Sequence, residues 1–306
     1  MKYDLAIAHR VCPTLSATAI GFDSKLDMVK VTTASLVAAL HGLKVHLIVL
    51  LDGCPYEYEE IFVNSFAQFA RETSGDSCDM QLVRTPAIGN HATWARQIAE
   101  LLAVDDAPFL YFSEDDYLYD TSAFHAMIDF LKRNPKVDFV SPLDHPDRYR
   151  KDMIEVRRGG IKVSPYCHWR EISTTCLTFM MRKNDLIKTQ RAFATYARGN
   201  LDCTMWIGLT KDGVFNVFRL LAAFFSYCRR SPEFGRMLPL AAWKWRGLGL
   251  LVERRYHLWS PIPTLAVHLS SVSLPLEADR YFKSITEREI VKKQMGSYLG
   301  FDVTQI

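Results

Sequence analysis

The stretch VHLIVLL, residues 45–51, is almost unbroken apolar sequence, and it stops at Asp52-Gly53. So short and so apolar a run predicts a strand that is buried on both faces, which is typical of a parallel sheet. Because the run ends in an Asp-Gly turn, we expect the carboxyl end of this strand to be polar.

Strands and helices alternate on both sides of residues 45–51. Short apolar runs predict further strands at residues 5–8, 80–84, 109–112 and 137–140. Helical periodicity between them predicts helices at residues 26–40, 56–71, 90–102 (with Asn90 as the cap) and 122–133. This order predicts an α/β fold with a mostly parallel sheet, helices on both faces, and ligands at the carboxyl ends of the strands. After residue 141 the pattern loosens, with one more strand expected at 174–181.

The composition is that of a globular and nearly neutral chain. Of 306 residues, 49% are hydrophobic and 23% are charged, and 37 basic against 34 acidic residues leave a formal charge of +3. So small an excess predicts no nucleic-acid partner. Because no Gly/Ser-rich or Pro-rich linker divides the chain, we expect one compact unit, with a core at residues 1–200 and an appended, largely helical region at 201–306.

Cysteine usage and apolar stretches together predict a cytoplasmic protein. Seven cysteines occur without any C-x-x-C spacing, which fits a reducing compartment better than a disulfide framework or a zinc ribbon. The first ten residues lack the basic start and long apolar run of a signal peptide. The apolar run Leu220–Phe225 is far shorter than the roughly 20 residues that cross a bilayer.

Three adjacent carboxylates, Glu114, Asp115 and Asp116, follow the predicted strand at 109–112. Side by side at a strand end they repel one another unless a cation or hydrogen-bond donors compensate. Mg²⁺ or Mn²⁺ would do so, because both are held by carboxylates together with a bound diphosphate. The alternative is an acidic loop that caps the next helix.

The run FLYFSEDDYLY, residues 109–119, resembles the acidic metal motif of GT-A-fold glycosyltransferases. The likeness is to the Glu-Asp-Asp variant of the DxD motif, as in family-2 enzymes and in N-acetylglucosaminyltransferase I. The resemblance implies that Asp116 binds the metal, while Glu114 and Asp115 contact the ribose or sugar of the donor. It also implies a GT-A-like sheet and a nucleotide-sugar donor, for which UDP is expected.

Two further strand ends agree with this resemblance. Arg10 ends the first strand, where GT-A enzymes contact the nucleotide, and its planar donors suit a base or phosphate. Asp52 ends the second, where the family places an acid on the nucleoside. The alternatives are a loop salt bridge for Arg10 and a turn-forming role for Asp52.

The segment NLDCTMW, residues 200–206, followed by Leu209 and Gly213, resembles the part of inverting family-2 enzymes that carries the catalytic base. Asp202 is the implied base, which would take the proton of the acceptor hydroxyl as that hydroxyl attacks the anomeric carbon. The alternative is a helix cap, and a cap could also act as the base. Asp202 lacks the preceding acid often found in the family, and the first strand ends in HRVCP instead of the family's Pro-Thr-x-Asn.

Near the C-terminus, PTLAVHLSS at residues 263–271 resembles the late strand that supplies a further metal ligand in many GT-A enzymes. The resemblance implies that His268 meets Asp116 across the site. The alternative is a structural histidine after an apolar strand.

A basic and aromatic region, residues 215–259, suggests contact with a membrane surface. From Lys211 to Arg255 the chain carries nine basic and three acidic residues. Arginine beside tryptophan and phenylalanine is typical of peripheral contact with anionic lipid. The alternative, which the many Leu, Phe and Trp residues favour, is an ordinary helical subdomain with its own core.

Together these patterns predict a metal-dependent glycosyltransferase that moves a hexosyl or N-acetylhexosaminyl group, with inversion, from a nucleotide sugar to a saccharide or lipid-linked acceptor. Residues 1–200 would bind the donor, residues 201–306 would complete the acceptor side, and cell-surface polysaccharide or glycolipid synthesis would be the setting. A nucleotidyltransferase is one alternative, although VCPTL at 11–15 is not the Gly-rich loop such enzymes carry. A non-catalytic sugar- or lipid-binding scaffold is the other.

Overall fold

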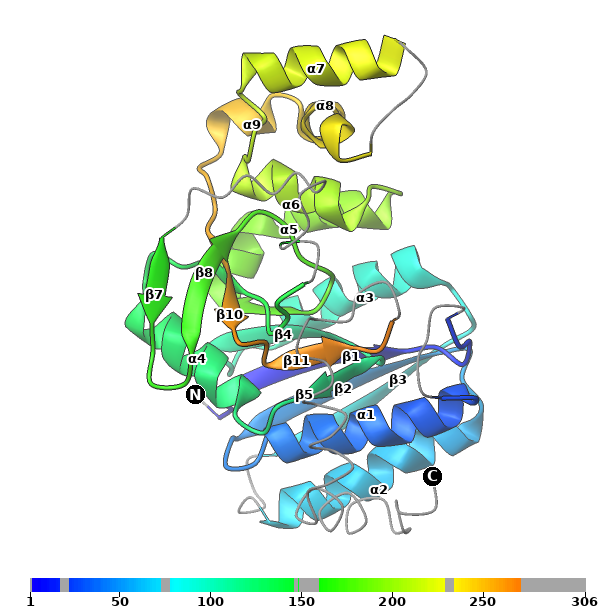
Figure 1. Ribbon diagram of the computed structural model, residues 1–306. Coiled ribbons are helices and arrows are strands. Elements are labelled where there is room, and N and C mark those ends of the chain that lie inside the picture. Colours follow the sequence, from blue (N-terminus) through cyan, green and yellow to red (C-terminus); the bar gives the residue numbers. More distant parts are fainter. Residues whose placement is uncertain are drawn as a thin grey trace.

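The computed structural model describes residues 2–16, 22–72, 78–145, 148, 160–228 and 234–270, without the side chains of 226–228 and 234–236. Within these residues a nine-stranded sheet forms the centre of the molecule, and helices cover both of its faces (Figure 1). The strand order is β3-β2-β1-β4-β9-β6-β10-β8-β7. The strands are β1 (Leu5–Val11), β2 (Val45–Asp52), β3 (Asp79–Thr85), β4 (Phe109–Glu114), β6 (Phe139–Val140), β7 (Ile161–Val163), β8 (His168–Ile172), β9 (Phe179–Arg182) and β10 (Leu258–Ile262).

Seven strands of this sheet point the same way, and only β8 and β9 run against them. The expected α/β architecture with a mostly parallel sheet is therefore confirmed. The strand expected at 174–181 is wrong in its bounds, because residues 174–178 form a loop and β9 begins at Phe179. It lies antiparallel between β4 and β6, a pairing for which local periodicity gives no signal.

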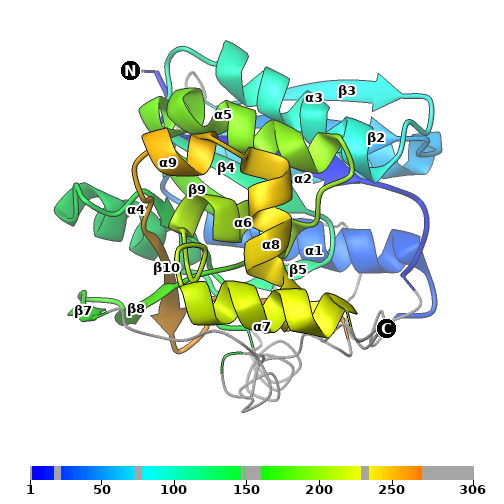
Figure 2. The same cartoon turned by 90° about the horizontal axis from the view of Figure 1, so that it is seen from above.

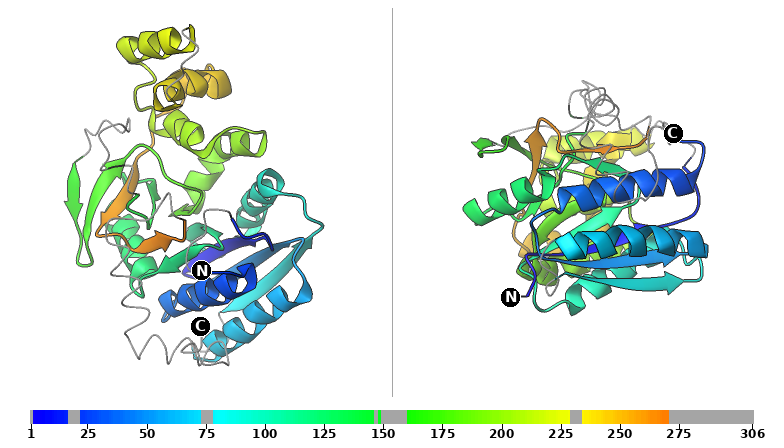
Figure 3. Two further views of the ribbon diagram at one scale, coloured as in Figure 1. Left: turned by 45° about the vertical axis from the view of Figure 1, so that its right-hand side comes forward. Right: turned by 90° about the horizontal axis from the view of Figure 1, so that it is seen from below.

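Alternate residues of the strands enter two separate cores. Leu5 and Ile7 of β1 belong to the core on one face, whereas Ala6 and Ala8 belong to the core on the other. The first face is covered by α1 (Lys25–Ala39), α2 (Tyr56–Glu72) and α4 (Ala123–Arg133). The second is covered by α3 (Asn90–Ala103), α5 (Lys183–Ala197) and α6 (Asp202–Thr210). Figure 3 shows α1 and α2 side by side against the sheet.

A small second sheet joins two distant parts of the chain. β5 (Tyr117–Tyr119) pairs antiparallel with β11 (Ala266–His268), and His268 stands opposite Tyr117 in the register. The backbone N–H of Leu269 donates to the carbonyl of Asp116 at 2.8 Å. The acidic run thus leads into a strand, and α4 begins only at Ala123. The interpretation of residues 114–116 as a helix cap is wrong for this reason.

The start of α3 also differs from expectation. Gly89 is the N-cap, with a φ of +85° that favours glycine, and it makes no side-chain capping bond. Asn90 is the first helical residue instead of the cap. The side chain of Asn90 accepts from Arg10 and donates to Tyr196. The polar group expected to cap the helix therefore links β1 to α5 instead.

The C-terminal helices stack at the end of the molecule farthest from α2 (Figure 1). They are α7 (Val217–Cys228), α8 (Phe234–Arg246) and α9 (Gly249–Val252), and α8 packs against both α6 and α7. A core is present here, around Val214, Ala242 and Leu250. It does not include the phenylalanines of α7, which are exposed, so the expectation that the apolar residues of this region form a core is wrong for α7.

After α9 the chain returns through β10 to the nine-stranded sheet and through β11 to the two-stranded sheet. Residues beyond 200 therefore supply helices at one end of the molecule and one strand to each sheet, and the division at residue 200 stays a prediction. Among the described residues, no helix combines the length and apolar character needed to cross a bilayer.

Candidate active site

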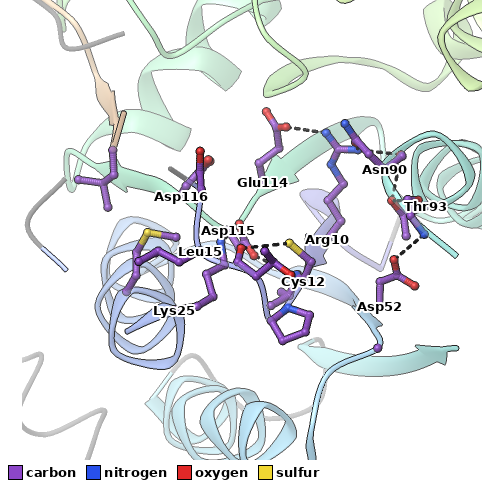
Figure 4. Close-up of a pocket in the computed structure, with 18 of the residues that line it drawn as sticks. Arg10, Cys12, Leu15, Lys25, Asp52, Asn90, Thr93, Glu114, Asp115 and Asp116 are labelled. Carbon is purple, nitrogen blue, oxygen red and sulfur yellow. Dashed lines mark hydrogen bonds and ion pairs between the residues drawn. The ribbon is translucent and has the colours of Figure 1, made fainter. Parts of the chain in front are cut away.

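A cleft of about 590 Å³ lies at the carboxyl ends of β1, β2 and β4 (Figure 4). This volume is in the range of small-molecule sites. The residues predicted from the sequence gather here, except for Asp202, which is not part of the lining. Those that line the cleft are Arg10, Asp52, Glu114, Asp115, Asp116 and His268. The loop after β1, residues 12–16, forms another part of the wall.

Glu114 is bound on both of its oxygens. Oε1 accepts from Arg10 Nη2 at 2.5 Å, and Oε2 accepts from Thr178 Oγ1 at 3.1 Å. Arg10 also donates through Nη1 to the side chain and the carbonyl of Asn90, and its guanidinium lies 6.0 Å from the ring centre of Trp94. Arg10 is thereby fixed at the cleft wall by an ion pair. It is a buried residue of β1, so this pair is not the exposed loop salt bridge of the alternative.

Asp115 is the most enclosed of the three acids. Its Oδ1 lies 2.7 Å from Lys25 Nζ, and its Oδ2 accepts from the backbone N–H of Cys12 at 3.0 Å. The side chains of Asp115 and Lys25 are only 9% and 6% exposed. Burial and the neighbouring Asp116 raise the pKa of Asp115 to about 6 against the opposing effect of Lys25. Thr32 of α1 also donates to the carbonyl of Asp115 at 2.9 Å, so α1 holds this turn in place.

Asp116 faces the histidine that the late strand delivers. His268 Nε2 lies 3.0 Å from Asp116 Oδ2, and the imidazole stacks on Tyr117 with ring centres 4.8 Å apart. Burial would raise the pKa of Asp116, but His268 and nearby cations lower it overall. The same contact holds the pKa of His268 above its usual value in spite of burial. Asp116 Oδ1 is buried without a hydrogen-bond partner among the described residues.

The described residues contain no group of three or more His, Cys, Asp and Glu side chains arranged to hold a metal. Asp116 and His268 offer one carboxylate oxygen and one imidazole nitrogen. Such a pair is too few ligands for a structural metal, but it suits a cation that arrives with the oxygens of a phosphorylated ligand.

Asp52 organises the loop that follows β3. Its Oδ1 accepts from Thr85 Oγ1 and the N–H of Ile88, both at 2.7 Å, and its Oδ2 accepts from the N–H of Gly89 at 2.8 Å. Gly53 is required beside it, because its φ is +67° and a Cβ there would stand 2.9 Å from Ala87. The turn-forming alternative for Asp52 thus describes its observed contacts, and Oδ2 keeps room for a further donor.

Asp202 is the first residue of α6, and Leu201 is the N-cap. Its Oδ1 accepts from the N–H of Cys203 at 2.6 Å. Burial raises the pKa of Asp202, and so does the charge of Glu114, while Arg10 acts in the opposite direction. Asp202 is therefore close enough to Glu114 and Arg10 of the cleft for their charges to act on its pKa. A carboxylate with a raised pKa is a stronger base than an ordinary aspartate.

Lys25 is a site residue that the sequence patterns did not identify. The helix at 26–40 was expected to serve packing, and its apolar spacing begins only after Lys25. A lysine in the first turn opposes the helix dipole, which favours negative charge there. That conflict was a readable signal that Lys25 has a carboxylate partner elsewhere.

Comparison with solved structures finds likenesses, among them the following two. The chain is similar to the crystal structure of S. aureus TarS 1-349, with 11% identity, a TM-score of 0.37, and coverage of 63% of this chain and 55% of that one. It is also similar to 4-diphosphocytidyl-2C-methyl-D-erythritol synthase from Anaerococcus prevotii, with 10% identity, a TM-score of 0.38, and coverage of 67% and 82%. No protein-family model and no curated protein matches the chain. Neither likeness assigns a function.

Proposed function

We propose that this chain is a metal-dependent glycosyltransferase with a GT-A-like fold, which transfers a sugar from a nucleotide-sugar donor to an acceptor hydroxyl. The observation that carries the proposal is the meeting of Asp116 and His268 at 3.0 Å in the cleft, where Asp116 also has a buried oxygen without a partner. An acid and an imidazole so placed suit a cation. Arg10 and Lys25 offset the charges of Glu114 and Asp115, which would otherwise repel a phosphorylated donor.

Asp116 and His268 would hold the cation, Mn²⁺ or Mg²⁺. When bound, the metal would offset the negative charge that builds on the leaving diphosphate. With only two protein ligands, the cation would take its other ligands from the oxygens of the donor. Mn²⁺ suits the mixed set better than Mg²⁺, because Mg²⁺ prefers oxygen alone.

The donor would lie along the cleft, with UDP as the expected nucleotide and a hexosyl or N-acetylhexosaminyl group. Arg10 and Asp52 would orient the nucleoside, and Glu114 and Asp115 would orient ribose or sugar. Because Glu114 and Asp115 are already bonded to other side chains, we expect them to act on the donor through the residues that they hold. They fix Arg10, Lys25 and the turn that carries Asp116.

Asp202 would act as the base that takes the proton of the acceptor hydroxyl. Its raised pKa and its electrostatic coupling to Glu114 and Arg10 support the assignment. Attack on the face of the sugar opposite the diphosphate would invert the anomeric centre. The acceptor would be a saccharide or a lipid-linked saccharide, and the enzyme would act in the cytoplasm, at the inner face of a membrane, in cell-surface polysaccharide or glycolipid synthesis.

The test is the melting temperature of the purified chain with nucleoside diphosphates and nucleotide sugars, each with and without Mn²⁺. A ligand at about 100 times its Kd stabilises the folded state by roughly 2.7 kcal/mol, which raises the melting temperature by several degrees. We expect a Mn²⁺-dependent rise with a uridine nucleotide, absent in Asp116→Asn and retained in Asp105→Asn, which alters an exposed carboxylate. No rise with any nucleotide would favour the non-catalytic scaffold.

Nucleotidyl transfer is the second candidate, because Lys25 stands beside the loop after β1 and could contact a triphosphate. The same measurement separates the two. A rise with nucleoside triphosphates and none with nucleotide sugars would favour the nucleotidyltransferase.

A further inference from the structure

The helix α7 presents an apolar face to solvent. Phe218 is 84% exposed and Phe225 is 57% exposed, although a phenylalanine in this position would ordinarily be buried. The other large exposed residues of the helix are Val217, Leu221 and Phe224. The neighbouring Phe215 is half exposed as well.

These residues form a single stripe and not a scatter. Positions 217, 218, 221, 224 and 225 have the spacing i, i+1, i+4, i+7 and i+8, which covers about 120° of a helix surface. The buried Ala223 lies on the opposite side, where α7 packs on α8. Arg219 also lies off the stripe and pairs with Asp212 at 3.6 Å. The exposed stripe, named here the α7 face, therefore contains no charged residue.

The sequence around α7 carries an excess of basic residues. Residues 211–236 contain five basic residues and two acidic residues, Asp212 and Glu233. Arg229 and Arg230 follow directly after the last residue of α7. A contiguous apolar stripe rich in phenylalanine, in a segment with more basic than acidic residues, is complementary to the interface of an anionic bilayer.

The length and position of α7 fit a helix that lies in the plane of a membrane. Its 12 residues span about 18 Å at 1.5 Å per residue, well short of the roughly 30 Å of a hydrocarbon core. It lies at one end of the molecule, where Figures 1 and 2 show it outside α6 and α8. We propose that the α7 face docks this protein on an anionic lipid bilayer, with the phenylalanines entering the headgroup boundary.

Sedimentation with lipid vesicles tests this inference without reference to any reaction in the cleft. The two preparations are vesicles of phosphatidylcholine alone and vesicles in which roughly a third of the lipid is phosphatidylserine. We expect the chain to bind the second preparation, more weakly as salt is raised, and to bind the first far less. The variant Phe218→Gln/Phe225→Gln, which keeps good helix formers, should lower the bound fraction by about tenfold or more.

The matched control is Ile161→Thr/Val163→Thr on the edge strand β7, which removes two apolar side chains that are 67% and 72% exposed. It should bind vesicles as the unaltered chain does. The melting temperatures of both variants should equal that of the unaltered chain, because all four positions are exposed. A further variant, Arg229→Gln/Arg230→Gln, removes positive charge and should reduce binding to the anionic vesicles only.

Three results would overturn the proposal. The unaltered chain could fail to bind either kind of vesicle, or the α7 variant could bind as tightly as the control. A chain that stays off vesicles but forms dimers in solution, and loses them in the α7 variant, would show that the α7 face is a protein interface. The nucleotide measurements on the cleft would stand in each case, because they need no membrane.

Discussion

His268 Nε2 lies 3.0 Å from Asp116 Oδ2, although the two residues are 152 positions apart in the chain. The pairing of β5 with β11 brings them together. It is one of three such contacts, because Glu114 pairs with Arg10 and Asp115 pairs with Lys25. Each of the three consecutive carboxylates thus has its own cationic or protonatable partner from a different element, which explains how the run is tolerated at a half-buried strand end.

Removal of the imidazole should weaken the binding of the cation. For His268→Ala we expect Mn²⁺ affinity, measured by calorimetry with a uridine diphosphate present, to fall by about tenfold or more, since one of two protein ligands is lost. His125→Ala on α4 is the control, because His125 lies outside the cleft and bonds the carbonyl of His41. Equal Mn²⁺ affinity in the His268 variant would remove His268 from the proposed metal site.

The buried pair of Lys25 and Asp115 should be costly to break. Lys25→Met leaves the Asp115 carboxylate enclosed without its cation, so we expect the free energy of unfolding in urea to fall by about 3–5 kcal/mol. The double variant Lys25→Met/Asp115→Asn should recover part of this loss, because it removes the unpaired charge. Arg133→Met, which breaks an exposed pair with Asp129, should cost less than about 1 kcal/mol. A loss in Lys25→Met no larger than this would contradict the prediction.

Asp202 should affect turnover and not donor binding. In Asp202→Asn the side chain keeps its shape and loses its basicity, and we expect the transfer rate to fall by about 10²- to 10⁴-fold. The Mn²⁺-dependent rise in melting temperature with nucleotide should remain. Asp212→Asn is the control, because Asp212 lies near the end of α6 and pairs with Arg219. A loss of nucleotide binding in Asp202→Asn would point to a structural role instead.

His9 should make the protein sensitive to mild acid. Burial lowers the pKa of His9 to about 3, with Lys25 acting in the same direction, and its Nδ1 bonds Ser113 Oγ at 2.8 Å. The folded state therefore holds this histidine neutral, while the unfolded chain takes up a proton near pH 6.5. The stability that comes from keeping His9 neutral is fully present above about pH 6.5 and is lost as the pH falls toward 3. At pH 5 the free energy of unfolding should be lower by roughly 2 kcal/mol for this reason.

The measurement is urea unfolding at pH 7 and pH 5. The loss of stability between these values should be smaller in His9→Gln than in the unaltered chain, and unchanged in the control His125→Gln, which alters a half-buried histidine on α4. Identical losses in all three proteins would show that His9 does not carry the effect.

The elements near the N-terminus could be predicted well from the sequence, since each carries its own periodicity. Residues 45–51 became a strand with its polar end at the cleft, and the helix expected at 56–71 is α2. The bounds expected for the strand at 174–181 were wrong, because the extent of β9 depends on its pairing with the distant strands β4 and β6. For α7, apolar composition favoured a core, and composition cannot tell whether other elements are available to cover a helix.

The sequence by itself determined the α/β order, the mostly parallel sheet, and the presence of acids and Arg10 at strand ends. These follow from local rules, because burial on both faces makes a strand apolar and the turn after it polar. Only the tertiary structure decided which partner each acid has, that Lys25 enters the cleft, and that the α7 face stays exposed. These outcomes depend on contacts between residues far apart in the chain, such as Asp116 with His268, whose pairing no local pattern encodes.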